Sequence, residues 1–323
     1  MKFYQSKNAR IHLITLCSVI MLFTYACSGD TGYKHVDFSE RVLVKRPAGQ
    51  TADSFQLRVA VAAVISPKET FVYYRQLLDY IGHKLERKVQ LIQRKTYSEI
   101  NELFSKGQID LAFICSGPYA VSKEIYGFEA LATPIVLGIP FYHSYLIVNI
   151  DSPFQKIDDL RDQVFAFTDP KSNTGALVPT YWLAEMGERP DSFFSSVNYT
   201  YSHDNSIMAV ARNLVDGATV DGHIWEYYNI RNPIYTSKTR VIKKSQPFGS
   251  PPLVSSVYLP VKLKEKIRNS LFTMHQDPDG RRILKELMID RFVAPREIWY
   301  ESVRNMEQKV EASKNKANAT QNS

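Results

Sequence analysis

The feature that most constrains the fold is an alternation of strand, turn and helix that recurs three times between residues 57 and 126. Each round begins with a short, nearly continuous apolar run, at Leu57–Ile65, Val89–Gln93 and Ile109–Cys115. Such runs are typical of strands that are buried on both faces of a parallel sheet. Turn and capping residues follow each run and open a segment with helical spacing, so the pattern predicts βαβ units on a parallel sheet.

The alternation restarts after residue 150, with strands expected at Val164–Phe167, Val197–Tyr201 and Ala218–Asp221. Return strands are expected at residues 241–244 and 253–259. The predicted fold class is therefore α/β with two lobes, one of residues 55–143 with 250–305 and one of residues 145–246. The chain crosses between the lobes twice, near residues 142–150 and 246–254, which predicts a hinge and an interlobe cleft.

The N-terminal segment has the features of an export signal. Lys2, Lys7 and Arg10 precede an apolar run from Ile11 to Phe23, which is shorter than the about 20 residues needed to span a bilayer. The following stretch FTYACS resembles a bacterial lipobox, in which Cys27 becomes the lipidated N-terminal residue. We therefore predict a lipoprotein signal peptide at residues 1–26, a tether at residues 27–54 and membrane anchoring on the periplasmic side. The alternatives are cleavage without lipid and an uncleaved anchor.

Charge and cysteine usage narrow the function classes. Three of the 40 basic residues lie in the export signal, so the rest of the chain carries 37 against 33 acidic residues, interspersed along its length. This mild excess does not indicate nucleic-acid binding and hints at most at a bound anion. Cys115 is the one cysteine beyond residue 27, so the exported part is expected to have no internal disulfide. The polar tail at residues 306–323 lacks apolar spacing and is predicted to be disordered.

Polar side chains follow the strands at the edge where open α/β sheets bind their ligands. The clearest signal is the segment Asp169–Pro179, which joins a strand to a helix through Ser172, Asn173 and Thr174. Unpaired backbone N–H groups and the helix dipole at such a start, with hydroxyl groups beside them, suit a tetrahedral oxyanion. The alternative is that Ser172 or Asn173 simply caps the helix.

Further candidates follow other strands. Ser116 opens a second helix start in the segment SGPY, with Tyr119 in its first turn, and Tyr97 follows the second strand. His203 can donate to an oxyanion through a ring nitrogen, and Asp221 ends a later strand. The structural alternatives are a turn and cap at Ser116, a half-buried helix residue at Tyr97 and a structural histidine at His203. No cluster has metal-ligand spacing.

Taken together, these elements and motifs resemble the periplasmic phosphonate-, phosphite- and phosphate-binding proteins of ABC transporters, the PhnD type. The resemblance covers about residues 57–300 and implies the two-lobed type II periplasmic binding protein fold. The motifs that carry it are LRVAVAAVI at residues 57–65, KTY at 95–97, KGQIDLAF at 106–113, DPKSNTGALVP at 169–179, HD at 203–204, AVA at 209–211 and VDGA at 215–218. It implies that the anion's oxygens are held by the residues matching Tyr97, Tyr119, Ser172, Thr174 and His203, with the Asn173 amide beside them.

One departure from the family concerns the ligand. The positions that align with the acidic residues neutralising an ammonium group in relatives hold His223 and Pro251. Asp221 or Glu226 could substitute for them. The departure nevertheless favours a smaller anion such as phosphate, phosphite or a simple alkylphosphonate.

The resemblance implies a monomeric solute-binding lipoprotein, without catalysis or cofactor, that captures a phosphorus oxyanion and delivers it to an ABC permease. An alternative partner is a membrane histidine kinase that senses phosphate-like or arsenic oxyanions. A Cys115 thiolate could then bind arsenite, although a free cysteine usually only packs. A hydrolase with Ser172 or Ser116 as nucleophile is disfavoured, because GxSxG, HExxH, Walker, GxGxxG and CxxC motifs are absent.

Overall fold

The computed structural model describes the backbone of residues 56–62, 64 and 67–321. These residues all belong to one compact unit of the chain. The predicted signal peptide, the tether and the lipid site at Cys27 lie outside the described residues. Over the described ranges, no helix combines the length and the apolar character that a bilayer span requires.

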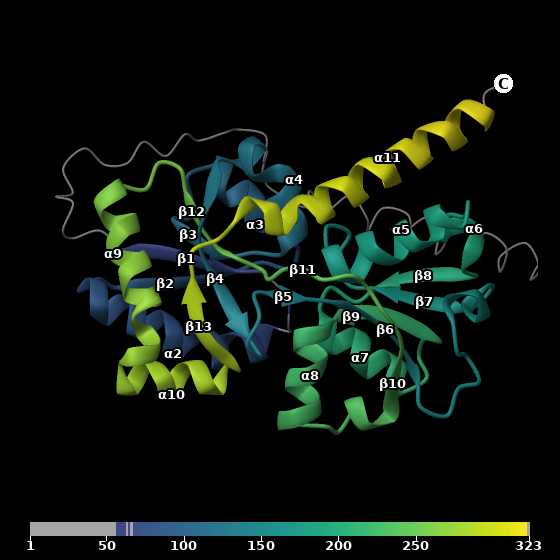
Figure 1. Cartoon of the computed structure of the whole chain (residues 1–323), viewed down its shortest axis with the longest axis horizontal. Helices are drawn as coiled ribbons and strands as arrows, with labels where there is room; N and C mark the ends of the chain where they lie inside the picture. Colours follow the sequence, from purple (N-terminus) through teal and green to yellow (C-terminus); the bar gives the residue numbers. More distant parts are fainter. Residues whose placement is uncertain (1–55, 63, 65–66, 322–323) are drawn as a thin grey trace, which may run out of the picture. The chain divides into compact units, whose positions relative to one another are not determined.

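The first lobe is built on a six-stranded sheet of order β13-β4-β12-β3-β1-β2 (Figure 1). β1, β2 and β3 are parallel, whereas β12 and β13 run antiparallel to their neighbours. The strands are β1 (Leu57–Val61), β2 (Val89–Gln93), β3 (Leu111–Phe113), β4 (Phe128–Val136), β12 (Leu253–Ser256) and β13 (Ile289–Val293). The helices of this lobe are α2 (Pro67–Leu85), α3 (Tyr97–Ser105), α4 (Ser116–Tyr126), α9 (Val261–Phe272) and α10 (Pro278–Glu286).

The second lobe is built on a five-stranded sheet of order β10-β6-β9-β7-β8. β7, β8 and β9 are parallel, and β6 and β10 are antiparallel. The strands are β6 (Ser144–Asn149), β7 (Val164–Phe167), β8 (Ser196–Tyr199), β9 (Gly217–Asp221) and β10 (Thr239–Lys244). The helices are α5 (Val178–Glu185), α6 (Pro190–Phe193), α7 (His203–Ala211) and α8 (Gly222–Arg231).

Short helical turns occur in both lobes. Those of the second lobe are η1 (Ile157–Leu160), η2 (Asn173–Leu177) and η3 (Thr236–Lys238), and those of the first are η4 (Met274–Gln276) and η5 (Glu297–Tyr300).

The two crossings between the lobes run beside each other as a short ribbon. β5 (Phe141–Tyr142) pairs antiparallel with β11 (Phe248–Gly249), and Phe248 lies opposite Tyr142. β5 leads out of the first lobe and β11 leads back into it. The ribbon is therefore the covalent connection about which the lobes can rotate.

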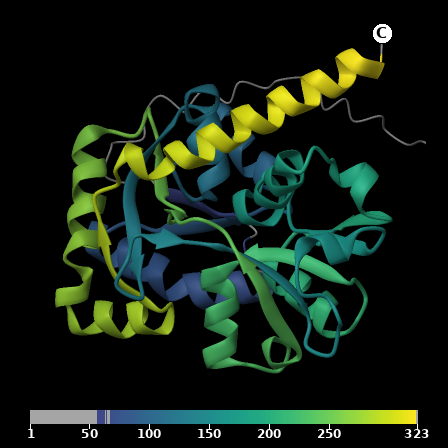
Figure 2. The ribbon, with the colours of Figure 1, turned by 45° about the vertical axis from the view of Figure 1, so that its right-hand side comes forward.

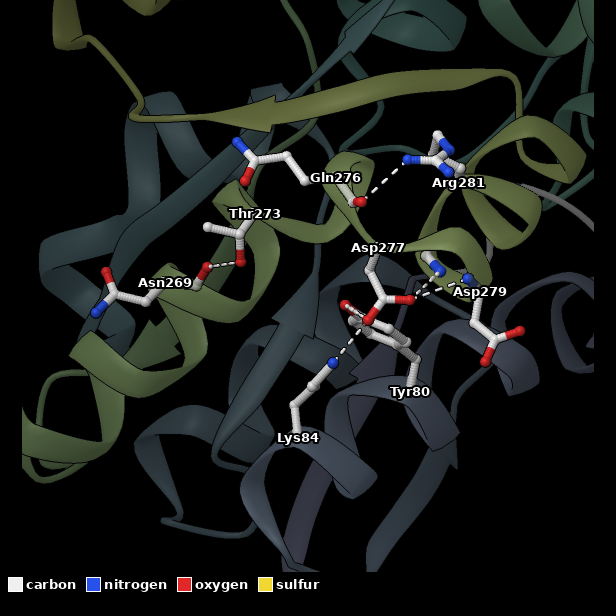
Figure 3. Close-up of polar contacts among 9 residues, drawn as sticks. Tyr80, Lys84, Asn269, Thr273, Gln276, Asp277, Asp279 and Arg281 are labelled. Carbon is white, nitrogen blue, oxygen red and sulfur yellow. Dashed lines mark hydrogen bonds and ion pairs between the residues drawn. The ribbon is translucent and has the colours of Figure 1, made fainter.

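A polar junction joins α2 to the start of α10 in the first lobe (Figure 3). Asp277 caps α10, because its Oδ1 accepts from the backbone N–H groups of Asp279 at 2.9 Å and Gly280 at 3.3 Å. Its other oxygen accepts from Lys84 Nζ at 2.7 Å and lies 3.4 Å from the Tyr80 hydroxyl. The hydrogen bond from Lys84 and the capping N–H groups lower the pKa of Asp277. The junction thus links two helices that lie far apart in sequence.

The helix α11 (Glu301–Gln321) corrects the prediction of a disordered tail, because residues 306–321 are helical. Val303, Met306 and Val310 are buried, and their spacing of three and four residues places them on one face. α11 contacts α4 of the first lobe and α5 of the second, and Figures 1 and 2 show it passing both. Three apolar residues are too few to stabilise an isolated helix, so the packing surfaces of both lobes supply its stability.

Candidate functional site

Two helix starts from opposite lobes meet between the sheets. α4 begins at Ser116, directly after Cys115, and η2, which continues into α5, begins at Asn173. The backbone N–H of Asn173 donates to Cys115 Sγ at 3.4 Å. A Cβ atom on Gly117 would lie 2.8 Å from the Lys171 carbonyl oxygen, so only glycine permits this contact. The positive ends of both helix dipoles therefore face the same interlobe space.

Two further hydrogen bonds between the lobes hold this arrangement closed. The backbone N–H of Tyr97 in α3 donates to Asp169 Oδ2 at 3.0 Å. The backbone N–H of His203 in α7 donates to the Val64 carbonyl at 2.9 Å. Each bond joins the residue at a helix start to the opposite lobe, so the strand ends of the two sheets face one another.

The second lobe contributes side chains at the start of η2. Ser172 caps it, because Oγ accepts from the Gly175 backbone N–H at 3.0 Å, as the capping alternative predicted. Asn173 Nδ2 donates to the Tyr142 hydroxyl at 3.2 Å. Thr174 Oγ1 is fully buried and has no hydrogen-bond partner among the described residues. Since an unpaired buried hydroxyl is costly, Thr174 is well placed to bind a ligand oxygen.

His203 is held in one tautomer. The backbone N–H of Asp221 donates to His203 Nδ1 at 3.0 Å, so the ring proton lies on Nε2. Burial lowers the pKa of His203 to about 3, and the ring is therefore neutral near pH 7. The backbone N–H of His203 and its Nδ1 are both engaged in hydrogen bonds, so Nε2 is the nitrogen through which the ring can donate to a ligand. His203 thus offers a neutral N–H donor.

Two buried tyrosines come from the first lobe and from the crossing ribbon. Tyr97 lies at the start of α3, and Tyr142 ends β5, where its hydroxyl hydrogen-bonds to Ser116 and Asn173. Burial raises the pKa of both tyrosines, so both phenols remain protonated donors. The sequence analysis missed Tyr142, because it considered only the residues after strands. A phenol in a predicted interlobe crossing is the signal that could have revealed it.

Tyr119 corrects the sequence analysis, because it does not join the other predicted site residues. Its hydroxyl donates to a Glu297 carboxylate oxygen, and its ring packs edge-on against Tyr300 with centroids 4.6 Å apart. Lys123 pairs with the same carboxylate at 2.8 Å. Tyr119 lies one turn into α4, on the helix face that packs against η5 and α11, so it stabilises this junction.

Asp221 and His223 lie where β9 passes into α8. Asp221 caps α8, since Oδ1 accepts from the backbone N–H groups of His223 at 2.8 Å and Ile224 at 3.4 Å. Burial raises the pKa of Asp221 to about 7, despite these two hydrogen bonds. Burial lowers the pKa of His223 to about 4, so its ring is neutral. At pH 7, His223 therefore carries no charge, and Asp221 is only partly ionised.

Apart from Tyr119, the predicted site residues are brought into one group, which we call the interlobe cluster. It consists of Tyr97, Cys115, Ser116, Tyr142, Ser172, Asn173, Thr174, His203 and Asp221. The cluster holds no lysine or arginine, so helix dipoles and neutral donors would supply its attraction for an anion. Over the described ranges, no group of three or more His, Cys, Asp or Glu side chains is arranged to hold a metal ion.

Comparison with known proteins identifies the family of the chain. A family model described as the periplasmic phosphonate substrate-binding protein of an ABC transporter matches residues 59–300. The phosphonates-binding periplasmic protein of Escherichia coli K12 is 30% identical over 248 residues, which cover 75% of this chain and 72% of that protein. The chain belongs to this family.

Other members of the phosphonate-binding family and its fold also match. The phosphate-import protein PhnD of Mycolicibacterium smegmatis is 26% identical over 65% of this chain and 64% of its own length. A binding protein component of an ABC phosphonate transporter from Pseudomonas aeruginosa superposes with a TM-score of 0.76 at 22% identity, covering 81% of this chain and 88% of that one. PhnD1 of Prochlorococcus marinus, in complex with methylphosphonate, gives a TM-score of 0.71 at 16% identity, covering 79% and 98% of the two chains.

Membership of the phosphonate-binding family confirms the predicted family and the two-lobed α/β fold class. Its members are exported periplasmic proteins that bind a small ligand for an ABC transporter. Because they bind their ligand without converting it, the prediction that this chain is not an enzyme is also confirmed.

Proposed function

We propose that the interlobe cluster captures a phosphorus oxyanion, namely a phosphonate, phosphite or phosphate, and that closure around it presents the protein to its ABC permease. The observation that carries this proposal is the contact of two helix starts from opposite lobes, with Asn173 N–H 3.4 Å from Cys115 Sγ. A tetrahedral oxyanion between them would accept from both helix starts. It would also accept from His203 Nε2 and from the Thr174 hydroxyl, which is buried without a hydrogen-bond partner among the described residues.

Closure follows from this distribution of donors. The Thr174 and His203 donors belong to the second lobe, and the Tyr97 phenol belongs to the first. One anion can accept from all of them only when the lobes are together, so it binds the closed state more tightly than the open one. That difference in affinity drives the equilibrium towards closure.

The relatives support the ligand class. The Escherichia coli relative is named for phosphonates and the mycobacterial relative for phosphate import, and PhnD1 holds methylphosphonate. Burial raises the pKa of Cys115, so its thiol stays protonated and is a poor ligand for arsenite. This favours a phosphorus oxyanion over arsenite.

Titration calorimetry tests the ligand class. Protein freed of ligand by partial unfolding and refolding is titrated with phosphate, phosphite, methylphosphonate, sulfate and arsenite. We expect at least one phosphorus anion to bind tightly and sulfate to bind weakly. Binding of arsenite alone would contradict the proposal, and so would the absence of heat with every anion.

A double variant tests the closing mechanism. Thr174→Ala with His203→Ala removes two donors from one lobe, and we expect it to abolish the compaction that the ligand causes in small-angle scattering. Ser192→Ala, at an exposed serine of the same lobe, is the control and should compact like the wild type. An unchanged compaction in the double variant would show that these donors do not drive closure.

We further propose that the protein is a lipoprotein anchored through Cys27. The support is the basic start, the short apolar run and the stretch FTYACS. Several acyl chains, at about 0.8 kcal/mol per buried CH₂, would anchor it firmly. Mass spectrometry of the N-terminal peptide from membranes should find diacylglycerol on Cys27, and Cys27→Ser should release the protein. An unmodified Cys27 within a longer peptide would contradict the anchor.

We also propose that the protein acts as a monomer. The donors of the interlobe cluster all come from a single chain, so the site needs no second copy. Light scattering of the ligand-bound protein should therefore give the mass of one chain. A mass of two chains would contradict the proposal.

A further inference from the structure

An interlobe cavity lies beside the interlobe cluster. Its volume is about 130 Å³, and its walls come from both lobes. Tyr74, Phe113 and Ile114 line it from the first lobe, and Ile224 and Tyr227 line it from the second. We call this cavity the apolar pocket.

The apolar pocket adjoins the place proposed for the anion. Asp221 lines the pocket, and its backbone N–H donates to His203 Nδ1 at 3.0 Å. On the first lobe, Ile114 lines the pocket and is followed directly by Cys115 of the interlobe cluster. The apolar pocket and the interlobe cluster therefore adjoin each other at Asp221 on the second lobe and at Ile114 on the first.

The described residues that line the apolar pocket include no lysine, arginine or glutamate, and Asp221 is the one carboxylic acid among them. Asp221 Oδ1 is already occupied by the N–H groups of His223 and Ile224. Burial raises the pKa of Asp221 to about 7, and a bound anion next to it would raise that pKa further by repulsion. The bound anion thus favours the neutral acid at Asp221, which weakens the compensation that this carboxyl group can offer an ammonium group for lost hydration.

We propose that the apolar pocket takes the organic substituent of a phosphonate and that this substituent is uncharged and apolar, such as a butyl or phenyl group. This inference rests on the proposed function, because the anion must first occupy the interlobe cluster. The volume sets the upper size, since an engineered apolar cavity of about 150 Å³ holds benzene. We therefore expect a larger organophosphonate as the ligand, instead of the small anion that the sequence favoured.

A ligand series tests the inference on the full chain. Calorimetry compares phosphate, methylphosphonate, n-butylphosphonate, phenylphosphonate and 2-aminoethylphosphonate. Each methylene transferred from water into an apolar site tightens binding by roughly fourfold. We expect butyl- or phenylphosphonate to bind at least tenfold more tightly than methylphosphonate, and 2-aminoethylphosphonate to bind more weakly than butylphosphonate.

A filled pocket provides the matched variant. Ile224→Phe enlarges a half-buried side chain of α8 that lines the pocket, and Ile230→Phe makes the same change at an exposed position of that helix. Ile224→Phe should remove the advantage of butyl- and phenylphosphonate while leaving phosphate and methylphosphonate binding unchanged. Ile230→Phe should retain the advantage. The unchanged binding of the small anions serves as the check that Ile224→Phe is folded.

The outcomes separate this inference from the proposed function. If phosphorus anions bind but affinity does not rise with the size of an apolar substituent, the inference is overturned and the proposed function stands. Tightest binding of 2-aminoethylphosphonate would also overturn it, because Asp221 would then act as an ionised partner of the ammonium group. If no phosphorus anion binds, the proposed function fails, and the inference fails with it.

Discussion

At the scale of single residues, the site depends on groups that are small or uncharged. Gly117 allows two helix starts to touch, and His203 is kept neutral by burial. The backbone N–H of Asp221 then fixes the proton on the far ring nitrogen of His203. In the proposed function, an anion is recognised by fixed dipoles, which avoids the cost of burying a lysine or arginine charge.

Gly117→Ala should weaken anion binding by about tenfold or more, because a loss of ~1.4 kcal/mol in closed-state stability already has that effect. The added Cβ would lie 2.8 Å from Lys171 O and 3.2 Å from Asn173 N, so full closure would require the lobes to shift. Calorimetry with methylphosphonate measures the change. Ser122→Ala on the same helix is the control, and equal affinity for Gly117→Ala and the wild type would contradict close contact in the bound state.

Asp221 predicts a pH dependence of binding. Burial places its pKa at about 7, so the carboxyl is mostly neutral at pH 6 and mostly ionised at pH 8. An ionised carboxylate beside the bound anion repels it, and affinity should fall with rising pH by about tenfold per unit above that pKa. Calorimetry across this range on wild type and Asp221→Asn measures the difference, since the amide keeps the cap but does not titrate. Parallel pH profiles of the two proteins would refute the assignment.

At the scale of elements, α11 shows how a helix can arise from few apolar residues. Val303, Met306 and Val310 recur at helical spacing, but the rest of the segment is polar, so sequence alone suggested disorder. α4 and α5 supply the surface on which this narrow stripe is buried. Tyr119 was misassigned for a related reason, because the direction of a side chain on a helix depends on what packs against that helix.

Met306→Ala should lower the free energy of unfolding by about 2 kcal/mol or more, since it removes a buried side chain between the elements that α11 joins. Urea denaturation measures the loss. Gln308→Ala, at an exposed position two residues away, should leave stability within about 0.5 kcal/mol of the wild type. Equal stability of Met306→Ala and the wild type would mean that α11 does not pack on the body of the protein in solution.

At the scale of the whole molecule, the strand ends of two sheets become one site only through closure. The bonds from Tyr97 to Asp169 and from His203 to Val64 join lobes that the chain connects through β5 and β11. Opening about this ribbon would break these bonds and expose the groups of the interlobe cluster. Ligand binding should therefore change access to buried residues far more than it changes secondary structure.

Cys115 reports on this motion. Cys115 is 4% exposed in the closed arrangement, and its thiol accepts a hydrogen bond from the backbone N–H of Asn173 of the other lobe. Saturating methylphosphonate should slow alkylation of the peptide that contains Cys115 by about tenfold or more, because only the open state admits the reagent. Mass spectrometry of that peptide follows the rate. In the Thr174→Ala, His203→Ala double variant, methylphosphonate should not slow the alkylation of Cys115. Equal slowing in the double variant and the wild type would mean that the protection of Cys115 does not depend on closure.

Sequence by itself determined the class of fold and most members of the candidate site. Short apolar runs followed by capping residues specify strands and helix starts locally, and parallel strands bring their ends to one edge. Ser172, Thr174 and His203 could be found in this way, since each follows a strand directly. These local rules also reached Asp221, but they said nothing of its shifted pKa.

Tertiary structure alone decided what touches across the lobes. Tyr142 entered the site because the ribbon places it between the two helix starts, and Tyr119 left it because η5 and α11 pack on its side of α4. The shifted pKa of Asp221 and the apolar pocket likewise depend on burial by residues distant in sequence. The physical reason is that capping and strand formation act between neighbours along the chain. Burial and side-chain direction are properties of surfaces that only packing creates.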